Sequence, residues 1–324
     1  MARIRRTSGL FLASRGVGTP WAVKNIPRHP GALGAQARPG IPKSAFLLRQ
    51  AAIFAWQYLL LDVMCAVSRL DGSSPAAPSA RKPSRYSEVT AAELPGYVFM
   101  VVASWFLVAR VLVDAGYRAV SLVAVSSGAS PPEDWPPLFG SMWTAFTLRN
   151  FWGKFWHQML RWPLTSWANY LARDLLRLPR PSLTERYLNT LLVFLLSGLL
   201  HVVVDSVQGV PPSQSKAMVF FPLFTVGFMV EDGIQEAWKR LGAPKQARQP
   251  DLGTPLWQRV LGFVWVITWM SLTSRQYLFA SRQMSEHGRE FVPISVVRFI
   301  GVPAGIFCLL VAGVTVKVAF GGEL

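Results

Sequence analysis

Two histidines are the residues whose surroundings in this sequence are suited to chemistry. His201 stands in LLVFLLSGLLHVVVD, where it is the first ionisable side chain and Asp205 is the next. Ionisable groups inside such apolar stretches are costly and usually face a cavity or a partner. His157 stands in RNFWGKFWHQMLR, among aromatic and basic residues. An imidazole with its ordinary pKa of about 6.5 can take a hydroxyl proton near neutral pH. We interpret His201 as a candidate catalytic residue, with a structural histidine bonded to a neighbouring helix as the alternative. From its surroundings alone, His157 is either part of a reaction centre or one more polar residue on the face of an interfacial helix.

Asp205 is the candidate partner of His201. Ser197, His201 and Asp205 follow one another at intervals of four residues, so they share one face of a helix. We expect the Asp205 carboxylate to accept a hydrogen bond from one imidazole nitrogen and to fix the tautomer. The other nitrogen would then be free to act as a base.

The stretch 149–161 predicts an amphipathic helix that ends at Pro163, because its polar and apolar residues separate with a period of 3.6. Aromatic residues would lie among lipid headgroups and basic ones in water, as in an interfacial helix. The polar face would hold Arg149, Asn150, Gly153, Lys154, His157, Gln158 and Arg161. The apolar face would hold Phe151, Trp152, Phe155, Trp156, Met159 and Leu160.

The elements that position these residues are apolar helices. The chain is 51% hydrophobic and only 15% charged, against about 25% charged residues in soluble domains. A helix needs about 20 residues to cross a bilayer. We therefore predict an all-α polytopic transmembrane bundle of about six spans, two of which, the third and fourth, are short and so tilted, broken or re-entrant. The segments are Ala45–Val67, Gly96–Val113, Thr190–Val204, Ala217–Val230, Leu256–Thr273 and Ser295–Phe320.

Charge is distributed as in a membrane protein. The net charge is +16, and most basic residues lie between the apolar segments, which favours cytoplasmic loops and a lipid-bilayer partner over a nucleic acid. Residues 1–44 hold eight Lys and Arg and no acid. We interpret them as a basic cytoplasmic segment, with a mitochondrial transit peptide as the alternative, and residues 45–324 as one membrane-embedded domain.

The same charges create a conflict over depth in the membrane. They place 149–186 on the cytoplasmic side, whereas His201 lies near the far end of its span. A second span around 117–125 would invert everything after it. If the two histidines share a site, one of the two segments must enter the membrane.

Other catalytic and cofactor motifs are missing from the sequence. It contains no Gly-x-Ser-x-Gly, no Gly-x-Gly-x-x-Gly, no Walker loop and no His-Glu-x-x-His. Its two cysteines, Cys65 and Cys308, lie in apolar segments far apart. We expect neither a metal nor a bound cofactor.

Three segments resemble one family. LRNFWGKFWHQMLR resembles the Phe-Trp-x-x-x-Trp-His signature of the wax-synthase-like branch of membrane-bound O-acyltransferases. LLSGLLHVVVD is similar to the segment that carries that superfamily's histidine, and SRGVGTPWAVKN, residues 14–25, to the Arg-Gly-x-Gly-Thr-x-Trp segment of its fungal members. In the family that last segment usually follows several spans, so the resemblance implies an N-terminally short fold here.

The resemblance implies acyl transfer from a coenzyme A thioester to an alcohol, in the endoplasmic reticulum membrane. Fungal relatives acetylate terpenoids and other secondary metabolites, and plant relatives make long-chain wax esters. His201 matches the family's catalytic histidine. His157, with Asn150, Trp152 and Trp156, matches the second motif.

We therefore expect His201 to deprotonate the acceptor hydroxyl, while His157 or Asn150 binds the thioester carbonyl or the acceptor. Lys154 and Arg161 would meet phosphates, either those of acyl-CoA or those of lipids. The rivals from other classes are a transporter with His201 and Asp205 as a proton relay and a non-catalytic membrane protein.

Overall fold

A computed structural model describes residues 15–29, 40–73, 94–241, 254–285 and 292–320. Helices account for all regular structure within these ranges. The chain divides into two compact units, which are described separately. The first unit takes its described residues from 27–138 and 288–324, and the second from 14–26 and 139–287. The predicted boundary at residue 44 stays a prediction.

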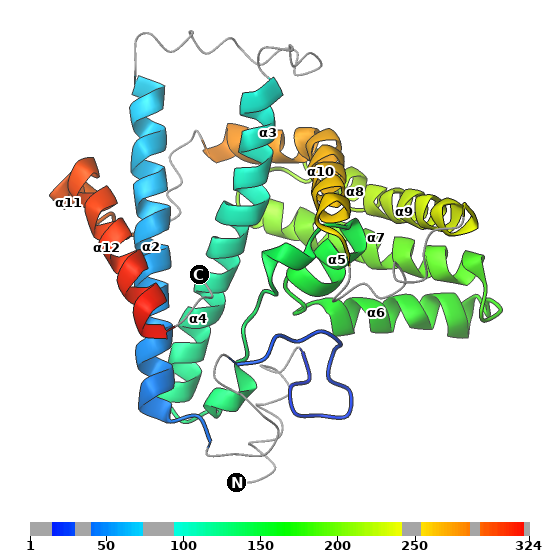
Figure 1. Ribbon diagram of the computed structural model, residues 1–324, viewed down its shortest axis with the longest axis horizontal. Coiled ribbons are helices and arrows are strands. Elements are labelled where there is room, and N and C mark those ends of the chain that lie inside the picture. Colours follow the sequence, from blue (N-terminus) through cyan, green and yellow to red (C-terminus); the bar gives the residue numbers. More distant parts are fainter. Residues whose placement is uncertain (1–14, 30–39, 74–93, 242–253, 286–291, 321–324) are drawn as a thin grey trace. The chain divides into compact units, whose positions relative to one another are not determined.

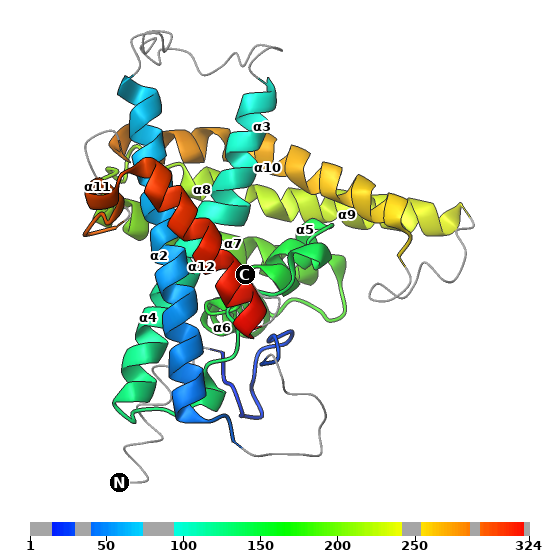
Figure 2. The same ribbon diagram turned by 60° about the vertical axis from the view of Figure 1, so that its left-hand side comes forward.

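In the first unit, helix α2 packs against α4 and α12 (Figures 1 and 2). Helix α3, the π-helical segment η1 and α4 follow one another without a break, so residues 117–125 complete this helix and form no separate span. The elements are α2 (Lys43–Ser73), α3 (Leu94–Val102), η1 (Ala103–Ala109), α4 (Arg110–Ser126), the 3-10 turn η2 (Pro132–Asp134), α11 (Val297–Ile300) and α12 (Val302–Phe320).

A buried polar network joins α2 to α4. The Asp114 carboxylate accepts from Arg118 Nε at 2.8 Å and from Gln57 Nε2 at 2.6 Å. Arg118 also donates to Gln50. Charges are tolerated inside apolar helices when they are paired and hydrogen-bonded in this way.

The second unit holds both candidate histidines. Its central helix α7 packs against α6, α8 and α9. Ser182 Oγ caps α7 by accepting from the backbone N–H of Glu185 at 3.1 Å, which is the usual role of serine at that position. The elements are the 3-10 turn η3 (Met142–Thr144), α5 (Leu148–Asn150), the π-helical turn η4 (Phe151–Phe155), α6 (Arg161–Asn169), the π-helical turn η5 (Tyr170–Leu175), α7 (Leu183–Val207), α8 (Ala217–Phe220), α9 (Leu223–Arg240) and α10 (Leu256–Ser285).

The prediction of a polytopic helical membrane protein is confirmed. Within the described ranges, five helices are long and apolar enough to cross a bilayer, and α10 is not one of them. The spans predicted to be short are longer than expected, because each helix continues past its most apolar part. The fourth is broken at Phe221–Pro222, as predicted. The five are Lys43–Val67, Leu94–Ser126, Leu183–Val207, Ala217–Arg240 and Val302–Phe320.

The prediction of a single interfacial helix over 149–161 is wrong. The chain forms the short helix α5 and the turn η4, becomes extended at Trp156 with ψ 150°, and begins α6 at Arg161. Pro163 therefore lies in the first turn of a new helix, where proline is tolerated. The apolar face is covered by protein, because Phe151 and Phe155 are both 0% exposed.

Candidate functional site

The segment before His157 is held by side chains at both of its ends. Thr147 Oγ1 accepts from the backbone N–H of Asn150 at 3.0 Å and caps α5. At the other end, Gln158 Nε2 donates to the carbonyls of Trp152 at 3.0 Å and Trp156 at 2.6 Å. These are backbone acceptors that the end of the helical turn leaves without intrahelical partners. Gln158 is 2% exposed, so its amide is part of the core rather than of a polar surface.

Trp152 anchors this segment to two candidate spans. Its ring centroid lies 5.8 Å from that of Phe194 on α7 and 4.9 Å from that of Phe224 on α9. The ring centroid of Trp156, one turn later, lies 5.8 Å from that of Trp152. The segment therefore lies against the apolar part of α7 and α9, as a site shared with His201 requires; its membrane side stays a prediction. Its loop is basic by composition, but its aromatic side chains enter the span bundle.

The tautomer of His201 follows from one hydrogen bond. Its Nδ1 lies 2.8 Å from the carbonyl oxygen of Ser197, one turn earlier on α7. Because a carbonyl can only accept, this contact assigns the proton to Nδ1 and leaves the Nε2 lone pair unprotonated. The imidazole lies over Phe221, with ring centroids 4.1 Å apart. His201 can therefore act as a base through Nε2.

Asp205 does not form the predicted hydrogen bond with His201. One of its oxygens accepts from Ser215 Oγ at 2.6 Å, and the other from the Tyr277 hydroxyl at 3.4 Å. The carboxylate is 3% exposed and connects α7 to α10 and to the loop before α8. Its charge still acts on the imidazole one turn away without touching it. The i, i+4 spacing correctly puts the two on one helix face, but the backbone carbonyl takes the place predicted for the carboxylate.

His157 is a neutral, buried imidazole. Its pKa is lowered to about 4, mainly by burial and in addition by the nearby positive charges of His201 and Arg15. Its ring centroid lies 5.5 Å from that of Trp156 and 5.9 Å from that of Phe139. Its Nδ1 is buried and has no hydrogen-bond partner among the described residues. A polar atom in that position is available to a bound molecule.

The loop 15–25 brings a third motif to the same place. It closes through the backbone hydrogen bond from Val23 to Arg15 at 2.9 Å. At Gly16 the backbone has φ +62°, and an added Cβ would lie 2.8 Å from Trp21 Cδ1, so only glycine fits there. Asn25 Nδ2 donates to the carbonyl of Gly153 at 2.9 Å and ties the loop to η4.

Arg15 is a member of the site that analysis of residue types alone did not find. It is 3% exposed, and its charge acts on His157. The only signal in the sequence was the Arg-Gly-x-Gly-Thr-x-Trp resemblance, which assigned it no role. The three motifs of the resemblance therefore meet within the second unit.

Two acidic residues of α9 hold the start of the His157 segment. Glu231 accepts from the backbone N–H groups of Leu148 and Arg149, the latter at 3.2 Å, and from Trp265 Nε1 at 3.0 Å. The neighbouring Asp232 accepts from Arg149 Nε at 3.0 Å. Negative charge at the first N–H groups of a helix is favourable. From the sequence alone, Glu231 and Asp232 could be recognised only as the acidic residues that follow the predicted span Ala217–Val230.

The remaining predicted residues lie in different settings. Asn150 contributes its backbone N–H to the α5 cap, and Lys154 lies on η4. Arg161 Nη1 donates to the Gly153 carbonyl at 3.1 Å and to Gln158 Oε1 at 2.9 Å. Arg161 also lines a cavity together with Trp21 and Lys24. Lys154 does not line this cavity.

The arrangement is suited to proton transfer. It combines a base with a free Nε2, a second imidazole that stays neutral and a buried guanidinium. Within the part of the chain that the structure describes, no three His, Cys, Asp or Glu side chains form a metal-binding group.

Comparison with known proteins places the site within a family. The sequence model of the membrane bound O-acyl transferase family matches residues 135–223, which include both histidines. Acetyltransferase atnC of Arthrinium sp is 45% identical over 318 residues, covering 97% of this chain and 71% of that protein.

Two proteins of Aspergillus fumigatus are also similar. Acetyltransferase spyB is 42% identical over 100% of this chain and 55% of its own length. Acetyltransferase pyr8 is 40% identical over 100% of this chain and 75% of its own length. No solved structure matches the chain.

Proposed function

Because this chain belongs to the membrane-bound O-acyltransferase family, we propose that it moves an acetyl group from acetyl-CoA to a hydroxyl of a terpenoid or another lipophilic secondary metabolite. The acetyl group and the fungal context are supported by the names of its relatives. The chain is a multi-pass membrane protein, and we propose the endoplasmic reticulum as its membrane.

The observation that carries this proposal is the unprotonated Nε2 of His201, whose ring lies over Phe221 and is near enough to His157 for their charges to interact. Nε2 takes the proton of the acceptor hydroxyl as the hydroxyl oxygen attacks the thioester carbonyl carbon. The tetrahedral intermediate then loses the C–S bond. The leaving thiolate takes the proton back from His201, so the products are the ester and free coenzyme A.

His157 is proposed to bind the thioester carbonyl oxygen through its unpartnered Nδ1. With a pKa of about 4, His157 is neutral at working pH. It therefore carries no extra proton that it could give to His201 in place of the hydroxyl proton. A single donor at a developing oxyanion contributes about 10²–10³-fold in rate. Asn150 is the second candidate for this role. Trp152 and Trp156 are proposed to form the apolar wall beside the substrates.

The proposal is tested with microsomes that express the chain, labelled acetyl-CoA and a panel of terpenoid alcohols. We expect a labelled ester, and a loss of about 10²–10⁴-fold in His201→Ala. Ser206→Ala, on the same helix and with its hydroxyl bonded to the Val202 carbonyl, is the control and should keep full activity.

Three outcomes would contradict the proposal. Ester formation that survives in His201→Ala at equal expression removes His201 from the reaction. Ester formed only from long-chain acyl-CoA and fatty alcohols indicates a wax-ester synthase. Proton-dependent flux of a solute without any ester indicates a transporter.

A further inference from the structure

A cavity of about 460 Å³ lies where the loop 15–25 meets the start of α6. It belongs entirely to the second unit. Half of its lining residues are basic or aromatic, namely Trp21, Lys24, Arg161, Trp162 and Arg173.

Two of the three cations in this cavity are not neutralised by carboxylates among the described residues. Arg161 donates to a backbone carbonyl and to an amide oxygen, which are both neutral. Lys24 is exposed and contacts no described carboxylate. Arg173, in contrast, is paired with Glu185 at 2.7 Å. The cavity therefore offers two positive charges to a bound anion, and phosphate is an anion that both Arg and Lys side chains bind.

The cavity also exposes two indole rings. Trp21 is 53% exposed and Trp162 is 49% exposed, each next to a cation of the lining. Exposed tryptophan faces bind planar heterocycles by stacking, as in proteins that bind nucleic acid bases. Phosphate-binding cations beside stacking surfaces are complementary to a phosphorylated nucleoside.

The cavity is directly connected to the segment that carries His157. The carbonyl of Gly153 accepts from Arg161, which lines the cavity, and from Asn25, which ends the loop. A ligand held by Arg161 is therefore fixed relative to η4. We propose that this cavity binds the phosphorylated adenosine end of coenzyme A, an inference that rests on the proposed function.

The direction in which the donor lies in the cavity follows from the positions of Lys24 and Arg161. Its thioester must face the histidines, so the adenosine 3′-phosphate is the group farthest from them. Lys24, which is exposed, is assigned to the 3′-phosphate, and Arg161, next to Gly153, to the pyrophosphate.

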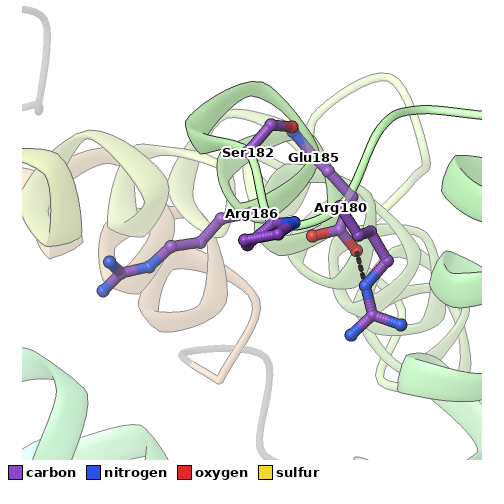
Figure 3. A pocket seen from close by; sticks show the side chains of 5 residues that line it. Arg180, Ser182, Glu185 and Arg186 are labelled. Carbon is purple, nitrogen blue, oxygen red and sulfur yellow. Dashed lines mark hydrogen bonds and ion pairs between the residues drawn. The ribbon is translucent and has the colours of Figure 1, made fainter.

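A second cavity, beside the start of α7, lacks this character. Figure 3 shows Arg180 directed toward Glu185 and Arg186 directed away from it. Glu185 lies 3.8 Å from Arg180, and Arg186 is paired with Asp232 at 2.9 Å. Both arginines of this second cavity face a carboxylate, unlike Arg161 and Lys24, which makes Arg180 a useful control.

The experiment compares acetyl-CoA with acetyl-dephospho-CoA, which lacks only the 3′-phosphate. For acetyl-CoA we expect Lys24→Ala to raise KM about tenfold, the size of one charge-assisted hydrogen bond. With the dephospho donor, wild type and Lys24→Ala should have the same KM. Trp162→Ala should raise KM for both donors, and Arg180→Ala should change neither.

A KM that Lys24→Ala raises equally for both donors, or leaves unchanged for both, overturns the assignment. So does an effect of Lys24→Ala that follows the phosphatidate content of the vesicles instead of the donor, because the site would then hold a lipid headgroup. Binding of labelled coenzyme A to purified protein is measured separately. If wild type forms no ester from either donor, the proposed function fails. If ester forms but the donors are not distinguished, only this inference fails.

Discussion

The hydrogen bond from His201 Nδ1 to the Ser197 carbonyl is internal to α7, so it persists wherever that helix is intact. Many catalytic histidines owe their tautomer to a carboxylate. Here a backbone carbonyl does this, while Asp205 holds Ser215 and Tyr277 instead. The base therefore depends on the helix itself, and Asp205 acts through the packing of neighbouring elements.

His157 predicts a pH dependence of stability. In the folded state its pKa is about 4, whereas the unfolded chain has the ordinary value of 6.5. Between these values the unfolded state binds more protons, so this group makes the free energy of unfolding fall as pH drops from about 6.5 toward 4. We expect His157→Gln to reduce the fall in melting temperature between pH 7 and pH 5, measured in detergent.

A substitution at a residue of the same segment that does not titrate separates the effect of His157 titration from other effects on stability. Asn150→Ala does not titrate and should keep the wild-type slope of melting temperature against pH. Equal slopes for wild type and His157→Gln would show that His157 is not held neutral in the folded state.

At the scale of elements, α9 is the helix against which the His157 segment is built. Its Glu231 accepts from the start of α5, and its Gly227 allows Leu148 of α5 and Trp269 of α10 to approach closely. A Cβ at residue 227 would lie 2.5 Å from Leu148 Cδ1 and 2.9 Å from Trp269 Cε2. The absence of a side chain at this position is therefore what lets three elements meet.

Gly227→Ala should destabilise the protein by about 1–3 kcal/mol, because overpacking forces its neighbours to shift. It should also lower activity, since Leu148 begins the segment that leads to His157. Thermal unfolding and ester formation measure the two effects.

The matched control is Gly233→Ala on the same helix. This position is exposed and an added Cβ would meet nothing within 4 Å. Alanine in a helix is favoured over glycine by about 0.5–1 kcal/mol, so this variant should be as stable as wild type or slightly more so. Equal behaviour of the two variants would contradict the close packing at Gly227.

Five of the six predicted spans fall on helices that could cross a bilayer, because hydropathy is a local property of the sequence. The predicted span Leu256–Thr273 lies on α10, which is not among them. The segment 149–161 was not predictable, because a period of 3.6 identifies an apolar face without saying what covers it. Phe151 and Phe155 are covered by protein. Their neighbour Trp152 packs on Phe194 and Phe224, which lie far away in the sequence, and such tertiary contacts leave no local pattern.

Partners far apart in sequence were also beyond prediction. The Glu231 carboxylate and the amide of Leu148 are 83 residues apart. The sequence around either residue does not indicate that the other is its hydrogen-bond partner. Only the resemblance suggested that the loop around Arg15 belonged with the histidines.

At the scale of the whole molecule, the connectivity of the spans fixes the side on which each loop emerges. Because α3, η1 and α4 form one continuous helix, residues 127–135 return to the side of residues 40–42. The next span, Leu183–Val207, then places 208–216 on the opposite side. From the loop charges we predict that residues 127–182 face the cytoplasm.

Single cysteines test this arrangement after Cys65 and Cys308 are replaced. In sealed microsomes, an impermeant maleimide should label a cysteine at Ser127 from outside, which is the cytoplasmic face. A cysteine at Ser213 should be labelled only after detergent is added. The reverse result, or labelling of both positions without detergent, would contradict the span order.

The hydrogen bond between Asn25 and Gly153 joins residues 128 positions apart. Ribosomes add about 5–20 residues per second, so the loop emerges roughly ten seconds before its acceptor exists. During that interval the loop cannot make this contact, and the candidate spans Lys43–Val67 and Leu94–Ser126 are synthesised before it forms. The loop that lines the proposed donor cavity is thus made well before the segment that fixes it in place.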